Sequence, residues 1–279
     1  MTPRRLLLAL CWAWLALVVA LPLGIVLVLA FARAAPGLPP FELAFSGGNF
    51  SLLVADGFYL RAFVRSLGIA ALATMLCLLL GYPLAYGLSR APAAWRGALL
   101  TAVMLPFWTG FLLRVSAWIG LLREDGWINA ALGALGVPGA PFPLLYSELA
   151  LQLGLVHVYL PFLVLPLYAR LSAREVALEE AASDLGAGKW TVFRRVTLPL
   201  SLPGVAAGSA LVFIPVCGEY VVPELLGGPG AETLGRVLWA EFFANRDWPM
   251  AAALAVAMLF VLLLPLALWR WRAGREMAG

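Results

Sequence analysis

Residues 178–204 read LEEAASDLGAGKWTVFRRVTLPLSLPG. This stretch gathers Glu, Asp, Lys and Arg between two long apolar runs, in a chain of 279 residues of which 63% are hydrophobic and 12% are charged. Such a composition does not fit the surface of a soluble protein, so we predict an integral membrane protein. A polar segment of this length must then lie outside the membrane, and the side on which it lies bears on what the chain does.

Six apolar stretches are long enough to cross a bilayer. A spanning helix needs about 20 mostly apolar residues, because its backbone amides have to be hydrogen-bonded without water. The predicted spans are residues 6–31, 66–89, 97–122, 149–169, 201–222 and 249–269. We therefore expect an all-α integral membrane protein with six transmembrane helices, forming a single transmembrane domain over residues 1–279.

The first apolar stretch follows Arg4 and Arg5 and has the charge pattern of a secretory signal. It is predicted to be retained, because it is much longer than a signal core of about 7–15 residues and only a weak cleavage site follows it. Cys11, Cys77 and Cys217 all fall within predicted spans. Packing as small apolar residues explains them without a disulfide or a metal.

The distribution of Lys and Arg predicts the orientation of the chain. Basic residues near membrane spans are retained on the cytoplasmic side. With the N-terminus inside, the cytoplasmic segments hold twice as many Lys and Arg as the outer segments, and the outer segments lean acidic. Both termini and residues 178–204 are then cytoplasmic, and this bias accounts for the net charge of +4 without nucleic acid binding.

Apolar residues repeat at helical spacing on both sides of Gly186 and Gly188. They are Val176, Ala177, Ala181 and Leu185 before the glycines and Trp190, Phe193 and Val196 after them. The pattern predicts two short amphipathic helices joined by a tight turn, neither long enough to span. A solvated loop with interfacial helices explains the composition equally well.

The identity of these residues goes further than their pattern. Glu180, Ala181 and Ala182, then Gly186, Val196, Leu198 and Pro199, resemble the EAA loop of ABC-importer inner-membrane permeases of the binding-protein-dependent transport family. That motif, E-A-A-x3-G-x9-I-x-L-P, differs here only in Val196 for Ile. The resemblance implies a MetI-like ABC importer permease fold in which residues 172–199 form coupling helices that dock on an ATPase. Small Ala side chains permit close approach and Gly186 allows a sharp turn.

The resemblance also implies partners. No nucleotide-binding loop of the form G-x-x-x-x-G-K-[ST] occurs in the sequence, so ATP and Mg²⁺ are expected on two separate ABC ATPase subunits. A second permease subunit, expected to be a different chain, and an extracytoplasmic solute-binding protein complete the implied importer. It would lie in a bacterial inner membrane, with no metal, cofactor or catalytic residue on this chain.

Two further segments resemble the spermidine/putrescine-type permeases. They are LPFWTGFLLRVSAWIGLLREDGWIN, residues 105–129, and FIPVCGEYVVPELLGGPG, residues 213–230. The second segment precedes the last predicted span in the sequence. Both segments most resemble the permease subunit whose gene usually comes first of the pair. This implies a polyamine or related organic cation as cargo. Related systems carry opines, amino-acid-like compounds, anions or iron, and these alternatives stay open.

Trp108, Glu219, Tyr220 and Glu224 are the candidates for the substrate pathway. A carboxylate at membrane depth is expensive and marks a partner or a pathway, and aromatic faces hold ammonium groups. The alternative is that the two glutamates cap helix ends or pair with Arg114, while the aromatic residues form an interfacial belt.

Arg114 lies within the third predicted span, where an unpaired guanidinium would repel a polyamine. Either it pairs with an acid such as Glu219, it extends to the interface, or the cargo is not a simple cation. His157 is the only histidine in the sequence and is expected to be a packing residue.

Two other classes of protein compete with an ABC permease. An ion-coupled secondary transporter would not need an EAA loop and would usually show more spans or an inverted repeat. A membrane-embedded enzyme would need a motif such as H-E-x-x-H, H-x-x-E-H or G-x-S-x-G, and none occurs in the sequence. We therefore expect a transport subunit and no enzyme.

Overall fold

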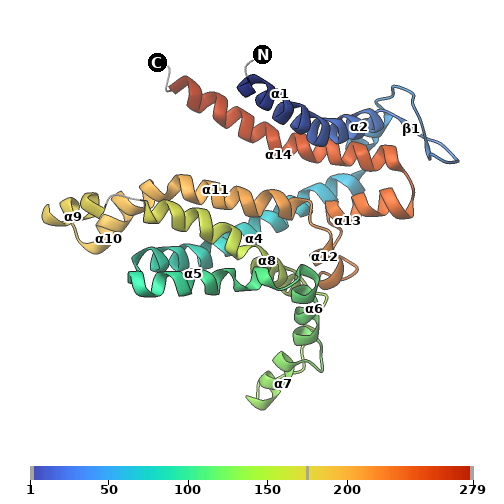
Figure 1. Ribbon diagram of the computed structural model, residues 1–279. Helices are drawn as coiled ribbons and strands as arrows, with labels where there is room; N and C mark the ends of the chain where they lie inside the picture. The colour runs from blue at the N-terminus through green and yellow to red at the C-terminus, as the bar shows by residue number, and fades with distance from the viewer. Residues whose placement is uncertain (1–2, 174–175, 277–279) are drawn as a thin grey trace. The chain divides into compact units, whose positions relative to one another are not determined.

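The computed structural model describes residues 3–173 and 176–276. The described part of the chain forms two compact units, one from Met1–Val64 and Leu234–Gly279 and the other from Arg65–Thr233. Both units consist almost wholly of helices (Figure 1). This confirms the predicted all-α class, in which the backbone groups are satisfied within each helix.

The elements follow one another in three groups. The first unit begins with α1 (Pro3–Leu15), the π-helical turn η1 (Ala16–Ala20), α2 (Leu21–Ala30), β1 (Arg33–Ala34), β2 (Phe41–Glu42) and α3 (Gly48–Ala55), and α4 (Gly57–Arg90) runs from it into the second unit. The second unit continues with α5 (Ala93–Trp108), α6 (Phe111–Leu122), α7 (Trp127–Ala134), α8 (Glu148–Ser172), α9 (Val176–Asp184), α10 (Lys189–Val192), η2 (Phe193–Thr197), α11 (Leu198–Cys217) and α12 (Val221–Leu226). The first unit is completed by α13 (Leu234–Trp239), η3 (Ala240–Ala244) and α14 (Trp248–Glu276).

Within the described residues, four helices are long and apolar enough to cross a membrane. They are Leu7–Ala30, Gly57–Arg90, Glu148–Ser172 and Lys189–Cys217. They overlap the predicted spans 6–31, 66–89, 149–169 and 201–222, and the last of them begins twelve residues before the predicted span and ends at Cys217. The predicted span 249–269 falls in α14, whose apolar stretch Trp248–Leu264 is shorter than these four.

The predicted span 97–122 is not one continuous helix. The segments Ala93–Trp108 and Phe111–Ala134 are bent by 87° at the short break between them. Thr109 and Gly110 are extended there, and both the amide and the hydroxyl of Thr109 donate to the carbonyl of Pro106, closing the last turn of α5. Counted as one span, the pair brings the long apolar spans to five, so the total of six remains a prediction.

The helices α8 and α11 pack closely against each other in the second unit, and Figure 1 shows them side by side. Gly204 and Gly208 of α11 lie one turn apart and face α8. A Cβ atom at Gly208 would lie 2.9 Å from the carbonyl oxygen of Leu163, and one at Gly204 would lie 2.8 Å from the Cβ of Arg170. Small residues at this spacing let two membrane helices approach to backbone contact.

In the first unit, α2 packs along α14 (Figure 1). Glu241 of η3 is buried, and its carboxylate accepts hydrogen bonds from the hydroxyl of Tyr59 and the amide of Asn245, both at 2.8 Å. The chain leaves α2 through two short antiparallel strands, in which Arg33 pairs with Glu42. Pro36, Gly37, Pro39 and Pro40 lie between the two strands and are typical of a loop and not of a continued helix.

Candidate functional site

The helix α9 ends in a tight turn at Gly186, as the sequence predicts. The amide of Gly186 donates to the carbonyl of Ser183 and that of Ala187 to the carbonyl of Ala182, which together form a Schellman motif. Gly186 has φ +80°, and no atom lies within 4 Å of the position its Cβ would take. The glycine is therefore required by the backbone angle and leaves open space beside the turn.

The second half of the polar stretch differs from the prediction of a separate short helix. The chain from Lys189 to Cys217 is one continuous helix, so α10 and η2 continue directly into α11, the helix in which the fifth predicted span begins. The amide of Leu198 donates to the carbonyl of Phe193, five residues back, so the backbone widens directly before Pro199. A proline has no amide hydrogen and clashes with the carbonyl four residues earlier, and the wider turn accommodates it without ending the helix.

The apolar face predicted for α9 points outward. Ala177 and Ala181 of this face are exposed, Leu185 in the turn is 90% exposed, and the side chain of Val176 lies outside the described residues. Leu178, which is not part of the predicted face, is exposed as well. On α10, Trp190 is 71% exposed. Exposed apolar side chains gathered on one polar segment are typical of a surface that another protein covers.

The EAA-type residues divide between this surface and the helix that follows it. Glu180 and Ala181 are exposed and Ala182 is half-buried on α9. Val196 and Leu198 are half-buried and Pro199 is exposed where η2 joins α11.

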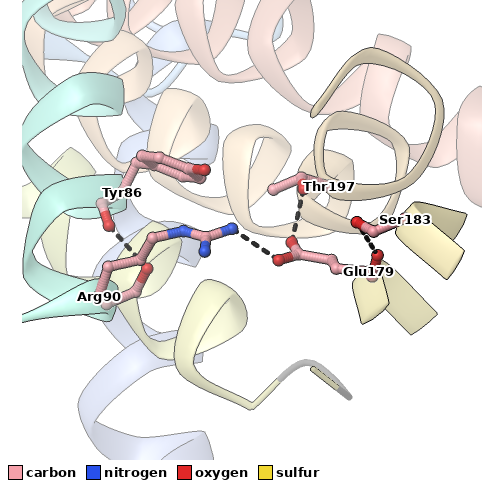
Figure 2. Close-up of polar contacts among 6 residues, drawn as sticks. Tyr86, Arg90, Glu179, Ser183 and Thr197 are labelled. Carbon is pink, nitrogen blue, oxygen red and sulfur yellow. Dashed lines mark hydrogen bonds and ion pairs between the residues drawn. The ribbon is translucent and has the colours of Figure 1, made fainter. Parts of the chain in front are cut away.

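Glu179, which the sequence does not single out, is buried on α9. Its side chain is 8% exposed, and Figure 2 shows it between three elements. The Nη2 atom of Arg90, the last residue of α4, lies 2.6 Å from Oε2 of Glu179, and the hydroxyl of Thr197 donates to Oε1 at 2.6 Å. The hydroxyl of Ser183 donates to the backbone carbonyl of Glu179 at 2.8 Å. One carboxylate therefore links α9 to the end of α4 and to η2, which leads into α11.

Aromatic side chains pack against Arg90 and around the start of the helix that carries Thr197. The guanidinium of Arg90 lies 4.8 Å from the centre of the Tyr86 ring. Phe193 contacts the rings of Tyr82 and Tyr86 edge-on and stacks on Trp190. A cleft of about 500 Å³ opens beside the link and is lined by side chains of both charges.

The pathway candidates lie at two places in the second unit. Trp108 is the last residue of α5 and is 76% exposed. Glu219 and Tyr220 directly precede α12, and Glu224 lies in its first turn. The Oε1 atom of Glu219 accepts from the amides of Val221 at 3.0 Å and Val222 at 3.4 Å. Its Oε2 atom accepts a hydrogen bond from the hydroxyl of Tyr159 on α8.

The guanidinium of Arg114 forms no ion pair with these carboxylates among the described residues. Its guanidinium lies 5.5 Å from the ring centre of Phe107 and 6.0 Å from that of Phe111. Two of its nitrogens, Nε and Nη1, are buried without a hydrogen-bond partner among the described residues. Of the three alternatives for Arg114, pairing with Glu219 is therefore not found among the described residues. His157 packs edge-on against Trp118, with ring centres 5.9 Å apart, as expected of a packing residue.

Comparison with known proteins identifies the family. The family described as "Binding-protein-dependent transport system inner membrane component" matches residues 3–269. The chain belongs to this family. It is 38% identical to the spermidine/putrescine transport system permease protein PotB of Escherichia coli strain K12 over 234 residues, which cover 84% of each chain. It is 35% identical to the protein of the same name from Haemophilus influenzae over 262 residues, covering 94% of this chain and 91% of that protein.

A solved structure confirms the fold of this binding-protein-dependent permease family. The crystal structure of a bacterial ABC transporter involved in the import of the acidic polysaccharide alginate matches with a TM-score of 0.75 and 19% sequence identity, over 99% of this chain and 96% of that one. The chain is thus an ABC importer permease subunit and a multi-pass inner-membrane protein. Its family is a transport family, so it is a transport subunit and not an enzyme.

Proposed function

We propose that this permease belongs to an ATP-driven importer and that α9 with its turn docks on an ATPase subunit in the cytoplasm. The exposed apolar group of Leu178, Leu185 and Trp190 is the observation that carries the proposal. Such side chains need a partner that removes them from water, and the exposed Glu180 beside them adds a charge that can pair across an interface.

The rest of the proposed importer follows from the family. Two ATPase subunits bind ATP and Mg²⁺, and a second permease subunit, a different chain, completes the pathway. An extracytoplasmic binding protein delivers the solute to the outer segments. Both termini of this chain lie in the cytoplasm in this proposal, and the excess of Lys and Arg in the segments on that side supports this orientation.

The proposed cargo is a polyamine or a related organic cation. Identity of 35–38% to permeases named for spermidine and putrescine supports it, as does the acidic balance of the segments expected outside the membrane. Glu219 offers a fixed carboxylate, and Trp108 and Tyr220 offer aromatic faces to an ammonium group. Arg114, with two buried nitrogens that lack partners in the described structure, favours a second candidate, a solute with an anionic group.

The docking proposal is tested by co-purification of the ATPase with the permease. Gly186→Arg places a large cation in the open space beside the turn, and Glu180→Lys reverses a charge on the exposed face. Each is expected to reduce bound ATPase about tenfold or more while the permease still inserts. Gly186→Asn is the matched control, because Asn tolerates positive φ without reaching far from the backbone. Bound ATPase at the wild-type level in both Arg and Lys variants would contradict docking at α9.

A further inference from the structure

We propose that Glu179 is a positioning residue that passes movements of α9 to two membrane helices at once, α4 and α11. The inference rests on the proposed function, in which α9 is the element that the ATPase moves. It concerns the inner side of α9, whereas docking uses the outer side. The two adjacent glutamates thus have separate roles, because Glu180 is exposed and Glu179 is buried.

The first step of the argument is the geometry of the carboxylate. Its two oxygens are held by different elements, Oε2 by Arg90 of α4 and Oε1 by Thr197 of η2, each at 2.6 Å (Figure 2). Short bonds of this kind to an ionised group are about twice as strong as neutral ones. A buried carboxylate that loses its cation is strongly unfavourable. When α9 moves, Arg90 and Thr197 are therefore expected to move with it.

The second step is that both partners are fixed to their own helices. Arg90 is the last residue of α4, and its guanidinium lies over the ring of Tyr86 one turn earlier. Thr197 is 1% exposed and is the last residue of η2, which continues without a break into α11. Ser183 ties its hydroxyl to the carbonyl of Glu179 and so fixes the residue within α9. Glu179 and its two partners, Arg90 and Thr197, are therefore each held firmly on their own helices.

The third step is the place where the link meets the helix Lys189–Cys217. Thr197 lies in a π-helical turn, and such turns are local departures from α-helical bonding that are frequent at functional sites. A force on Thr197 acts on the widened turn next to Pro199, whose missing amide hydrogen removes one backbone hydrogen bond from the helix. Movement of α9 is thereby directed into α11, which packs along α8.

The test measures labelled putrescine transported per ATP hydrolysed by the complete transporter in proteoliposomes. Glu179→Gln removes the charge that holds Arg90, and Thr197→Val removes the other bond while leaving the ion pair in place. In both variants the ATPase stays bound and hydrolyses ATP, and transport per ATP is expected to fall roughly 2- to 30-fold. Thr197→Ser keeps the hydroxyl and is expected to restore the wild-type ratio.

Glu148→Gln is the matched control, since it breaks an exposed ion pair with Arg65 in the same unit. A residue with a purely structural role would lower transport and hydrolysis together and leave their ratio unchanged, as this control should.

Two outcomes would overturn the proposed role of Glu179. A wild-type ratio in Glu179→Gln and Thr197→Val overturns the proposal, and so does loss of bound ATPase in these variants, which would assign Glu179 to the docking surface. If Glu179→Gln does not accumulate in the membrane, Thr197→Val decides alone. Bound ATPase at the wild-type level in both Gly186→Arg and Glu180→Lys would instead overturn the docking function, independently of the ratio measured for Glu179.

Discussion

At the scale of single residues, Glu219 combines a structural bond pattern with a position suited to cargo. Its carboxylate accepts the amides of Val221 and Val222 at the start of α12 and the hydroxyl of Tyr159. A negative charge is favoured at the N-terminus of a helix. These bonds fix the carboxylate, so an approaching cation meets a charge that is already oriented and loses little entropy in binding it.

Glu219→Gln separates the cargo role from the capping role. A glutamine oxygen still accepts the backbone amides, so α12 is retained, while the charge is lost. If the cargo is a cation, uptake of labelled putrescine should fall about 10-fold or more, in line with the strength of hydrogen bonds to charged groups. Uptake is measured in cells beside the Glu148→Gln variant at equal permease level. Unchanged uptake would leave Glu219 with the capping role alone.

The sequence could identify Glu219 as a costly charge but not its partners. Tyr159 lies 60 positions away, and only the packing of α8 against the segment before α12 brings the two side chains together. Glu179 could not be predicted from the EAA motif, because the motif begins at Glu180. The two adjacent glutamates have the same polarity. Because they lie about 100° apart around the helix, one is buried and the other is exposed.

At the scale of elements, hydropathy located most helices but not their breaks. The run over residues 97–122 is apolar enough for a single span despite Arg114, so its mean hydropathy does not show that Thr109 and Gly110 are extended. The polarity of residues 189–197 likewise hid their continuity with α11. The break at Gly110 and the continuity of residues 189–217 both depend on backbone geometry. Mean hydropathy measures only side-chain polarity and does not report that geometry. The turn at Gly186 was predictable because glycine is favoured where φ is positive.

The contact between α8 and α11 gives a prediction for stability. Gly208→Ala places a methyl group 2.9 Å from a backbone oxygen of Leu163, so the helices must separate, at a cost of about 1–3 kcal/mol. Gly87→Ala in α4 is the matched control, because no atom lies within 4 Å of its Cβ position. Thermal unfolding in detergent should show a lower Tm for the first variant only. Equal Tm values would mean that α8 and α11 are not packed through Gly208.

At the scale of the whole molecule, the bent pair α5 and α6 decides the topology. If the pair crosses the membrane, the chain has an even number of spans, and the turn at Leu185 lies in the cytoplasm with both termini. If the pair enters and leaves on the same side, α8 runs in the opposite direction and Leu185 lies outside. Docking of an ATPase at α9 is compatible only with the first arrangement.

Single cysteines at exposed positions distinguish the two arrangements. Leu43, Leu135 and Leu185 are each more than two-thirds exposed, and in a Cys11→Ser background the native Cys77 and Cys217 are buried. A membrane-impermeant thiol reagent added to spheroplasts should label Leu43→Cys and Leu135→Cys directly, and Leu185→Cys only after permeabilisation. The reverse result at positions 135 and 185, with Leu43→Cys still labelled, would show that the bent pair is re-entrant. The ATPase could then not reach α9, and the polar stretch would have to serve the outer side of the membrane.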